Sequence, residues 1–276
     1  MEHDDSKRAL DSFVAKWVAV EPELGITLNF LPPSQRASEA AFACLSRELA
    51  HTCFAIREGD VAVAKLGWWN EELLRSQQGE PRHPLTQTLD SHLDLSCVSI
   101  TSWQSVIAAA LHQRERDPAS EFAGQIAGFE ELFTPLAEIE ATLLGNRDAV
   151  ASARVAALTH ALREIAGVTR VLEGGHLALP LDALARHRLR RDEMDVDSPE
   201  RRRAAGEQLQ AIAIAFDQLA TSDTQLALVN HASLLADRAR AHKASRAEDP
   251  IAELVRQLPK LSMITTWNIW RAARVR

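Results

Sequence analysis

The chain has 276 residues, of which 46% are hydrophobic and 25% are charged, and its formal net charge at pH 7 is -7. This balance is typical of a globular protein and excludes a disordered chain. A net negative charge gives no general attraction to nucleic acid, so we expect no nucleic-acid partner.

The N-terminal sequence MEHDDSKRALDSF is acidic and lacks the apolar stretch of a signal peptide. No run of 18 apolar residues is present, so no transmembrane helix is predicted. The cysteines are Cys44, Cys53 and Cys97; their number is odd and their spacing does not fit a metal site, so we expect reduced thiols. The protein is therefore expected to be cytoplasmic.

The hydrophobic period is helical, and Ala, Leu, Arg and Glu are abundant, so the sequence predicts an all-α fold. We interpret the short segments GITLNFL and LDLSCVSI as extended connectors or helix ends, because neither has a hairpin signal. Typical helix lengths predict a single domain over 1–276 with about eight to twelve helices. Residues 1–10 are expected to be a flexible start. Large helical bundles place their ligand sites in the core between facing helices.

Capping residues mark several helix boundaries. Ser34 is expected to cap a helix that runs through Phe54. Three pairs place a side-chain acceptor before a proline at the first helical position: Asp117–Pro118, Ser198–Pro199 and Asp249–Pro250. Gly145 and Asn146 are expected to end one helix, and the next should run over about 147–166.

The segment LGWWNEELLRSQQGEPRHPLT, 66–86, begins as an amphipathic helix. Leu66, Trp69 and Leu73 have the spacing of a buried stripe. Trp68 is offset from Trp69 by about 100°, so we expect it at the edge of that stripe. The glycine and the prolines of GEPRHP should end the helix and fix the path into the next one.

Two segments leave alternatives open. RHRLRRDEMDVDSPERRR, 186–203, is interpreted as a solvated loop and helix start; the alternative is a basic platform for a diphosphate or a partner. The last segment, 250–276, places Trp267 and Trp270 beside arginines, and Pro259 should kink or divide it. Its simplest interpretation is a terminal helix packed on the body; the alternative is peripheral contact with a membrane or a partner.

No phosphate-binding loop, dinucleotide fingerprint, zinc-protease motif or nucleophile elbow is present. His51, His83 and His176 are expected to make local hydrogen bonds, and spacing alone assembles no catalytic triad.

Four blocks, in order, resemble the squalene/phytoene synthase family of head-to-head isoprenoid synthases. They are FLPPSQRASEAAFACLSRELAHTCF (30–54), the segment 66–86, FAGQIAGFEELFTPLAEIEATLLG (122–145) and GGHLALPLDALARHRL (174–189). The resemblance implies the isoprenoid-synthase fold, a single large helical bundle with a central cavity. It also implies two aspartate-rich motifs that hold Mg²⁺ against the leaving diphosphate of a prenyl substrate.

The chain departs from the family at the positions that carry this chemistry. AHTCF, 50–54, stands where the first aspartate-rich motif belongs, and Glu48 is the only acidic residue nearby. In REIAGVTRVLEGG, where the second motif belongs, Glu164 and Glu173 are too far apart in sequence to reproduce its spacing. Phe133 replaces the family's tyrosine in the third block, and the chain has no Tyr.

We therefore predict a squalene/phytoene-synthase-like protein with a degenerate diphosphate and Mg²⁺ site. It would bind an isoprenoid or lipid, or act as an assembly or partner protein, and would need no cofactor. The family includes a non-synthase branch that resembles mitochondrial complex I assembly factors, and RELAHTCF is closer to a segment of that branch than to an aspartate-rich motif. By family position, the candidates at the mouth of the cavity are Arg47, Glu48, His51, Phe133, Arg163, Glu164, Arg170 and Glu173.

The alternative is an active prenyltransferase with an atypical site. Glu48, Glu164 and Glu173 would then hold Mg²⁺ between helices, and Arg47, Arg163 and Arg170 would take the diphosphate through bidentate contacts. A helical protein without any isoprenoid connection is a third possibility, and its core would be filled with side chains.

Overall fold

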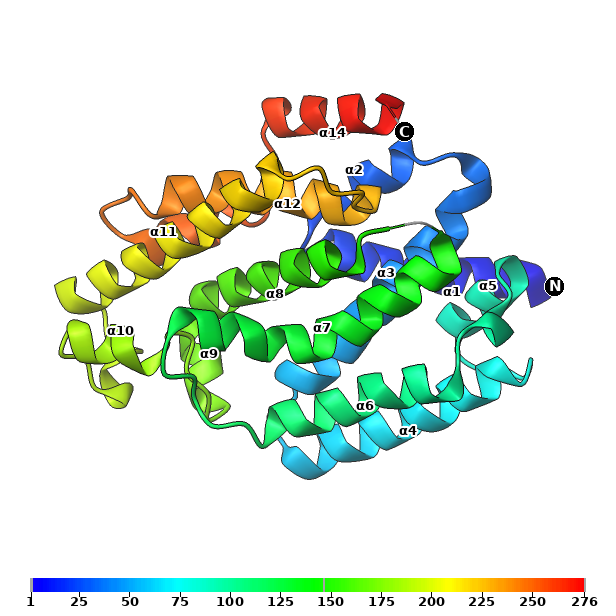
Figure 1. Cartoon of the computed structure of the whole chain (residues 1–276), viewed down its shortest axis with the longest axis horizontal. Helices are drawn as coiled ribbons and strands as arrows, with labels where there is room; N and C mark the ends of the chain where they lie inside the picture. Colours follow the sequence, from blue (N-terminus) through cyan, green and yellow to red (C-terminus); the bar gives the residue numbers. More distant parts are fainter. Residues whose placement is uncertain (1, 146, 276) are drawn as a thin grey trace.

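The computed structural model describes residues 2–145 and 147–275, and every regular element in these ranges is a helix (Figure 1). The α-helices are α1 (Glu2–Val18), α2 (Pro22–Phe30), α3 (Pro33–Phe54), α4 (Gly59–Gln77), α5 (Pro84–His92), α6 (Ile100–Arg114), α7 (Phe122–Leu144), α8 (Ala149–Ala166), α9 (Val168–Glu173), α10 (Leu181–Arg186), α11 (Pro199–Thr221), α12 (Leu228–Ala244), α13 (Pro250–Gln257) and α14 (Met263–Val275). Two 3₁₀ turns, η1 (Leu95–Cys97) and η2 (Arg191–Glu193), complete them. The predicted all-α fold is confirmed. The described ranges form more helices than expected because α9, α10 and α13 are very short.

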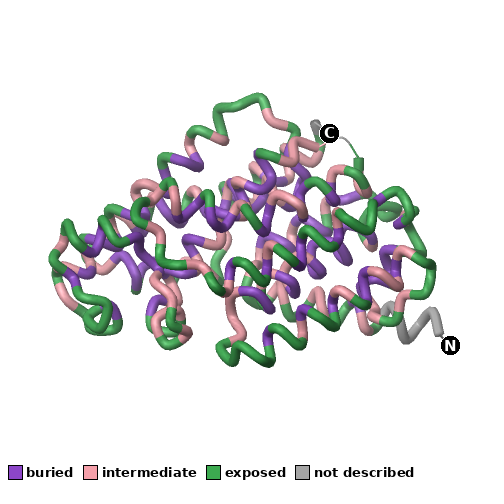
Figure 2. The backbone as a smooth tube through the Cα atoms, turned by 60° about the horizontal axis from the view of Figure 1, so that its bottom comes forward, coloured by how far each residue is buried: buried purple, intermediate pink, exposed green. Residues whose placement is uncertain are grey.

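The centre of the fold is the pair α7 and α8, which pack against each other along their lengths. Helices α3 and α6 contact α7, while α11 and α12 contact α8, so the central pair lies between two groups of helices (Figure 1). Small side chains allow the close packing: Ala153, Ala157 and Ala161 of α8 are all buried. Buried backbone is concentrated in this middle region, and exposed backbone lies at the periphery (Figure 2).

Several helix boundaries are where the sequence predicts them. The side chains of Ser198 and Asp249 accept hydrogen bonds from the backbone N–H groups of Arg201 and Ala252, and so cap α11 and α13. Helix α7 ends before Gly145, whose φ of 88° favours glycine. Asn146 lies outside the described residues.

The predicted caps at Ser34 and Asp117 are wrong. Helix α3 starts before Ser34, at Pro33, with Pro32 as its N-cap. No helix starts at Pro118, and α7 begins at Phe122. The loop before α7 is bound to α10 instead. The carbonyl oxygens of Ala119 and Ser120 accept hydrogen bonds from the first N–H groups of α10, both at 2.9 Å.

GITLNFL, interpreted as an extended connector or a helix end, forms the end of α2 up to Phe30. The hydroxyl of the β-branched Thr27 donates to the carbonyl oxygen of Glu23 at 2.7 Å, which accommodates it inside the helix. LDLSCVSI does form a connector, built around η1. Pro259 divides the last segment between α13 and α14, as predicted.

The segment 66–86 forms the end of α4, a turn and the start of α5. Leu66, Trp69 and Leu73 are 0%, 1% and 2% exposed, whereas Trp68 is 41% exposed, so the predicted stripe and edge are confirmed. Trp68 and Trp69 meet edge to face at a centroid distance of 4.9 Å.

The turn that follows is held by the buried carboxylate of Glu72. Its Oε1 accepts hydrogen bonds from the backbone N–H groups of Arg82 and His83, both at 2.8 Å, and from the Thr86 hydroxyl at 2.6 Å. His83 caps α5 through its Nδ1, which accepts from the N–H of Leu85 at 3.2 Å.

The N-terminal and charged segments also have defined structure. Residues 2–10, expected as a flexible start, lie on α1. The charged run 186–203 forms a mostly exposed loop with η2 and the first turn of α11, in agreement with its interpretation as a solvated loop and helix start. Asp197 pairs there with Arg201 and Arg202. Within the described ranges, no helix has the length and apolar character needed to cross a membrane.

Candidate functional site

A cavity of about 860 Å³ lies beside the central helix pair, and apolar side chains predominate in its lining. Its aromatic lining residues are Trp17, Phe42, Phe54, Phe129 and Phe133. Cavities of roughly 300–1,000 Å³ with a few polar groups are typical of small-molecule sites. The core of this bundle is therefore open, unlike that of a helical protein whose centre is filled with side chains.

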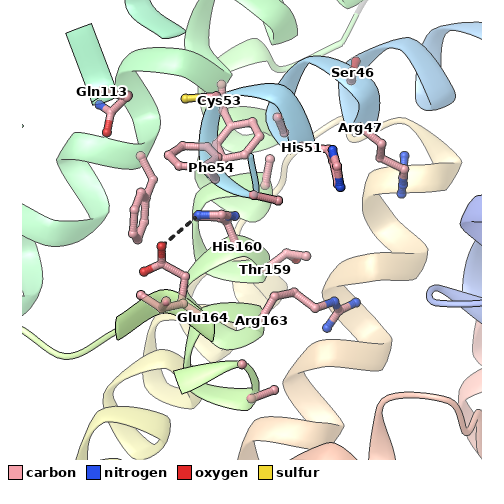
Figure 3. Close-up of a pocket in the computed structure, with 18 of the residues that line it drawn as sticks. Ser46, Arg47, His51, Cys53, Phe54, Gln113, Thr159, His160, Arg163 and Glu164 are labelled. Atoms are coloured by element: carbon pink, nitrogen blue, oxygen red, sulfur yellow. Dashed lines mark ion pairs between the residues drawn. The ribbon is translucent and has the colours of Figure 1, made fainter. Parts of the chain in front are cut away.

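Helix α3 lines one wall through residues spaced by three or four positions. This spacing places Arg47, His51 and Phe54 on one face, directed to the cavity (Figure 3). Glu48 is rotated away from that face and is buried. It forms an ion pair with Lys16 and accepts a hydrogen bond from Nε1 of Trp17 at 3.0 Å.

Helix α8 lines the opposite wall, with His160 and Glu164 at its centre (Figure 3). The His160 ring lies against Phe54 at a centroid distance of 3.9 Å and meets Phe129 edge to face at 4.7 Å. Its Nε2 is 3.3 Å from Oε1 of Glu164, one turn further along the helix. Packing of the ring thus fixes a histidine–carboxylate pair on the cavity wall.

Ion pairs hold two cavity-lining carboxylates and Arg47 of α3. Oε2 of Glu21 accepts from Nε of Arg47 at 2.7 Å. Burial lowers the pKa of Arg47, but the attraction of Glu21 outweighs burial, so the pKa is raised. Glu140 accepts from Arg147 at 3.1 Å and from Asn230 at 2.9 Å, although burial raises its pKa.

Arg163 belongs to a buried charge cluster behind the cavity. It donates to Asp237 at 3.0 Å and to Glu23 at 3.3 Å. Arg240 binds the same two carboxylates, with distances of 2.7 to 2.9 Å. These contacts join α2, α8 and α12 behind the cavity wall.

Exposed lining residues, which include Arg57 and Arg170, form the mouth of the cavity. Arg57 pairs with Glu173. Arg170 makes no ion pair with any residue that the structure describes. Burial, followed by the charges of Lys16, Lys65 and Arg170, lowers the pKa of His51.

The structure brings together six of the eight candidate residues. Those that line the cavity are Arg47, His51, Phe133, Arg163, Glu164 and Arg170. Glu48 and Glu173 are not part of the lining, because Lys16 and Arg57 hold their carboxylates in separate ion pairs.

The side chains do not fit a family-type Mg²⁺ site. Among the described residues, no three or more His, Cys, Asp or Glu side chains form a group that could hold a metal ion. The three glutamates of the prenyltransferase alternative, Glu48, Glu164 and Glu173, each have a different partner. Magnesium needs near-octahedral oxygen donors, which in such a site come from neighbouring carboxylates.

Sequence reasoning missed His160, Phe54 and Phe129 as lining residues. The spacing of His160 and Glu164, four residues apart, was the available signal for the polar pair. Nothing local shows that Phe54 of α3 contacts a histidine of α8, because that contact depends on the tertiary packing.

Together, the helices and the cavity define an all-α fold of the squalene synthase type. The structure is similar to the crystal structure of squalene synthase HpnC from Alicyclobacillus acidocaldarius, with a TM-score of 0.54 and 15% sequence identity over 98% of this chain and 95% of that one. No protein-family model matches the sequence, and a search of curated proteins found no match. At this identity the likeness shows the fold alone.

Proposed function

We propose that the protein binds an isoprenoid or lipid chain in the cavity and does not ionise a prenyl diphosphate. One observation carries this proposal: a cavity of about 860 Å³ with a mostly apolar lining, whose carboxylates do not gather around a metal position. The fold, shared with a squalene synthase, supports the cavity as a place for a prenyl-sized chain.

The charges around the cavity support binding without ionisation. Loss of a diphosphate requires positive charge where the leaving group develops, which clustered carboxylates supply by holding Mg²⁺. Here Glu21 and Glu140 are neutralised by Arg47 and Arg147. A metal could recruit them only by breaking buried ion pairs, which is strongly unfavourable.

The exposed Arg170 at the mouth supports an anionic head group on the ligand. Arg170 is exposed and has no carboxylate partner among the described residues, so it can contact such a head group without breaking an existing pair. The chain of the ligand would then extend along Phe54, Phe129 and Phe133.

The deciding experiment separates binding from catalysis. Purified protein is incubated with farnesyl diphosphate and Mg²⁺ while diphosphate release is measured, and binding is measured in parallel with EDTA. We expect saturable binding without Mg²⁺ and no release above the protein-free control. Mg²⁺-dependent release would instead support the prenyltransferase alternative.

A variant pair tests the mouth. Arg170→Gln should weaken farnesyl diphosphate binding by about tenfold, the loss of one charge-assisted contact. Arg203→Gln is the matched control, because Arg203 is an exposed arginine of α11 that pairs with Glu200 and does not line the cavity. The role as an assembly or partner protein stays a prediction.

A further inference from the structure

The wall of α8 carries buried polar atoms on residues that line the cavity. Within the described chain, four of these atoms have no hydrogen-bond partner: Oγ of Ser152, Oγ1 of Thr159, Nε2 of His160 and Oε2 of Glu164. Glu164 is 8% exposed and Ser152 is 2% exposed. All four atoms belong to residues that line the cavity.

Two of these atoms are adjacent and fixed in position. The His160 ring is held by Phe54 and Phe129, and its Nε2 approaches Glu164 within 3.3 Å without forming a hydrogen bond. The pair therefore offers one ring nitrogen and one carboxylate oxygen to a third group, with Thr159 next to the histidine.

An all-hydrocarbon ligand in the cavity would leave these atoms unsatisfied. Each buried polar atom left without a partner costs about five- to a hundredfold in affinity. A group that both donates and accepts avoids that loss, and a hydroxyl is the smallest such group.

We propose that the ligand of this cavity is a hydroxyl-bearing isoprenoid or lipid whose hydroxyl lies between His160 and Glu164. This inference rests on the proposed function. The hydroxyl donates to Oε2 of Glu164 and accepts from the Nε2–H group of His160. A second anionic group at this point would be repelled by the Glu164 carboxylate.

An ammonium group fits less well, because basic side chains outnumber acidic ones around the cavity. The basic lining residues are Lys16, Arg47, Arg57, Arg116, Arg163 and Arg170, and the acidic ones are Glu21, Asp117, Glu140 and Glu164. A neutral hydroxyl is repelled neither by the basic side chains nor by the Glu164 carboxylate.

Farnesol and farnesene provide the test, because they share a branched prenyl chain and farnesene lacks the hydroxyl. Binding is measured by displacement of the fluorescent probe 1-anilinonaphthalene-8-sulfonate. We expect farnesol to bind at least about tenfold tighter than farnesene. His160→Phe and Glu164→Met should reduce this preference to less than about threefold, because both remove polar atoms at similar volume.

The control variant is His112→Phe. His112 forms the same type of pair, with its Nδ1 2.8 Å from Glu131, but is exposed and outside the cavity lining. Glu164→Gln keeps an acceptor oxygen and should retain most of the preference for farnesol. It therefore distinguishes loss of the polar contact from misfolding caused by replacing Glu164.

The outcomes distinguish the two proposals. If neither these compounds nor farnesyl diphosphate binds, the proposed function fails and this inference fails with it; if only farnesyl diphosphate binds, the hydroxyl site alone fails. Equal binding of farnesol and farnesene to the unmodified protein would overturn the hydroxyl site and leave the proposed function standing. Equal binding is expected if the polar atoms of α8 do not contact the ligand. A preference that survives in both His160→Phe and Glu164→Met also overturns the site.

A separate observation concerns the outer face of α14, which lies on the outside of the bundle (Figure 1). Met263, Ile264 and Trp267 are 89%, 74% and 58% exposed. The exposed Arg271 and Arg274 continue the same helical stripe. The opposite face, with Ile269 fully buried, packs on α12 and α2.

Charge identifies the occupant of this face. Helix α14 contains arginines and no acidic residue, although the whole chain has a net charge of -7. The Arg274 guanidinium lies 4.1 Å from the Trp270 ring centroid, and Trp270 is 4.5 Å from Trp267. Exposed apolar side chains followed by Trp and Arg are characteristic of helices that lie in the interface of an anionic membrane.

We infer that α14 docks on an anionic lipid surface, with Met263, Ile264 and Trp267 inserted among the acyl chains and the arginines near the phosphates. Leu258 and Pro259, in the segment leading to α14, line the cavity. Docking would therefore place one side of the cavity close to the lipid from which a ligand is taken.

Cosedimentation with vesicles tests this second inference. We expect binding to phosphatidylcholine vesicles containing phosphatidylglycerol, and at least about tenfold weaker binding of the double variant Ile264→Ser/Trp267→Ser. Arg271→Gln and Arg274→Gln should each weaken binding by about fivefold. Val150→Ser is the control, because Val150 is 77% exposed and lies on α8.

Failure to sediment with the vesicles containing phosphatidylglycerol would overturn the membrane inference. So would equal binding of the unmodified protein and the double variant. Self-association that disappears in the double variant, without vesicle binding, would assign the face to a second copy of the chain instead.

Discussion

Replacement of Glu72 should destabilise the turn that joins α4 to α5. The Glu72 side chain is fully buried, and its Oε1 accepts three hydrogen bonds. A hydrogen bond to a charged group is worth about 1.5–3 kcal/mol. The two backbone donors, at Arg82 and His83, are partly exposed and can form hydrogen bonds with water when the carboxylate is removed. The low end of this energy range therefore applies to them. Glu72→Ala should therefore lower the free energy of unfolding by about 4.5–6 kcal/mol, and Glu72→Gln by about 2 kcal/mol.

The pH dependence of that loss gives a sharper test. Burial raises the pKa of Glu72, but hydrogen bonds from His83, Thr86 and Arg82 outweigh it and lower the pKa below the ordinary value of 4.5. A lowered folded-state pKa means that the stabilisation is complete above about pH 4.5 and is lost as the pH falls through the folded-state pKa. The difference in the free energy of unfolding between the unmodified protein and Glu72→Gln should therefore become smaller as the pH falls below about 4.5.

Urea unfolding at a series of pH values measures this difference. Glu71→Gln is the control, since Glu71 is the neighbouring, exposed glutamate of α4. A difference for Glu72→Gln that stays constant between neutral and acid pH would refute the assignment of the stabilisation to the charged carboxylate.

Three further outcomes follow from buried groups. Arg240→Met should cost about 3–5 kcal/mol in urea unfolding, because it leaves two buried carboxylates without their main partner. In the native protein one thiol should react with Ellman's reagent, and Cys97→Ser should abolish that reaction, because Cys97 is exposed whereas burial raises the pKa of Cys53 to about 12. Ala156→Trp should place an indole in the cavity and weaken farnesol binding by at least about tenfold, while the unfolding free energy changes by less than about 3 kcal/mol.

Local features of the fold could be predicted from the sequence. Caps such as Ser198 and Asp249 act on N–H groups three residues away, and the stripe of Leu66, Trp69 and Leu73 repeats with the helix. The failure at Asp117 has a different origin. Its loop is fixed by α10, which begins more than 60 residues later in the chain, and no local pattern reports that contact.

The same distinction explains what could be predicted of the site. Order and spacing of four sequence blocks indicated the bundle and its central cavity, and family position placed Arg47 and His51 at the mouth of that cavity. The partners of the charged residues could not be predicted. Glu23 meets Arg240 across 217 residues of sequence, and Glu39 meets Arg147 across 108. Such pairs decide which charges are free for a ligand.

The availability of arginines bears directly on the choice between binding and catalysis. The prenyltransferase alternative assigns the diphosphate to Arg47, Arg163 and Arg170. Arg47 is bound by Glu21, and Arg163 is bound by buried carboxylates of α2 and α12. Redirecting either one to a diphosphate would leave a carboxylate without its arginine, and that cost offsets the attraction between the arginine and the diphosphate. Arg170 alone of the three is uncommitted among the described residues, which suits a single anionic head group better than a diphosphate clamp.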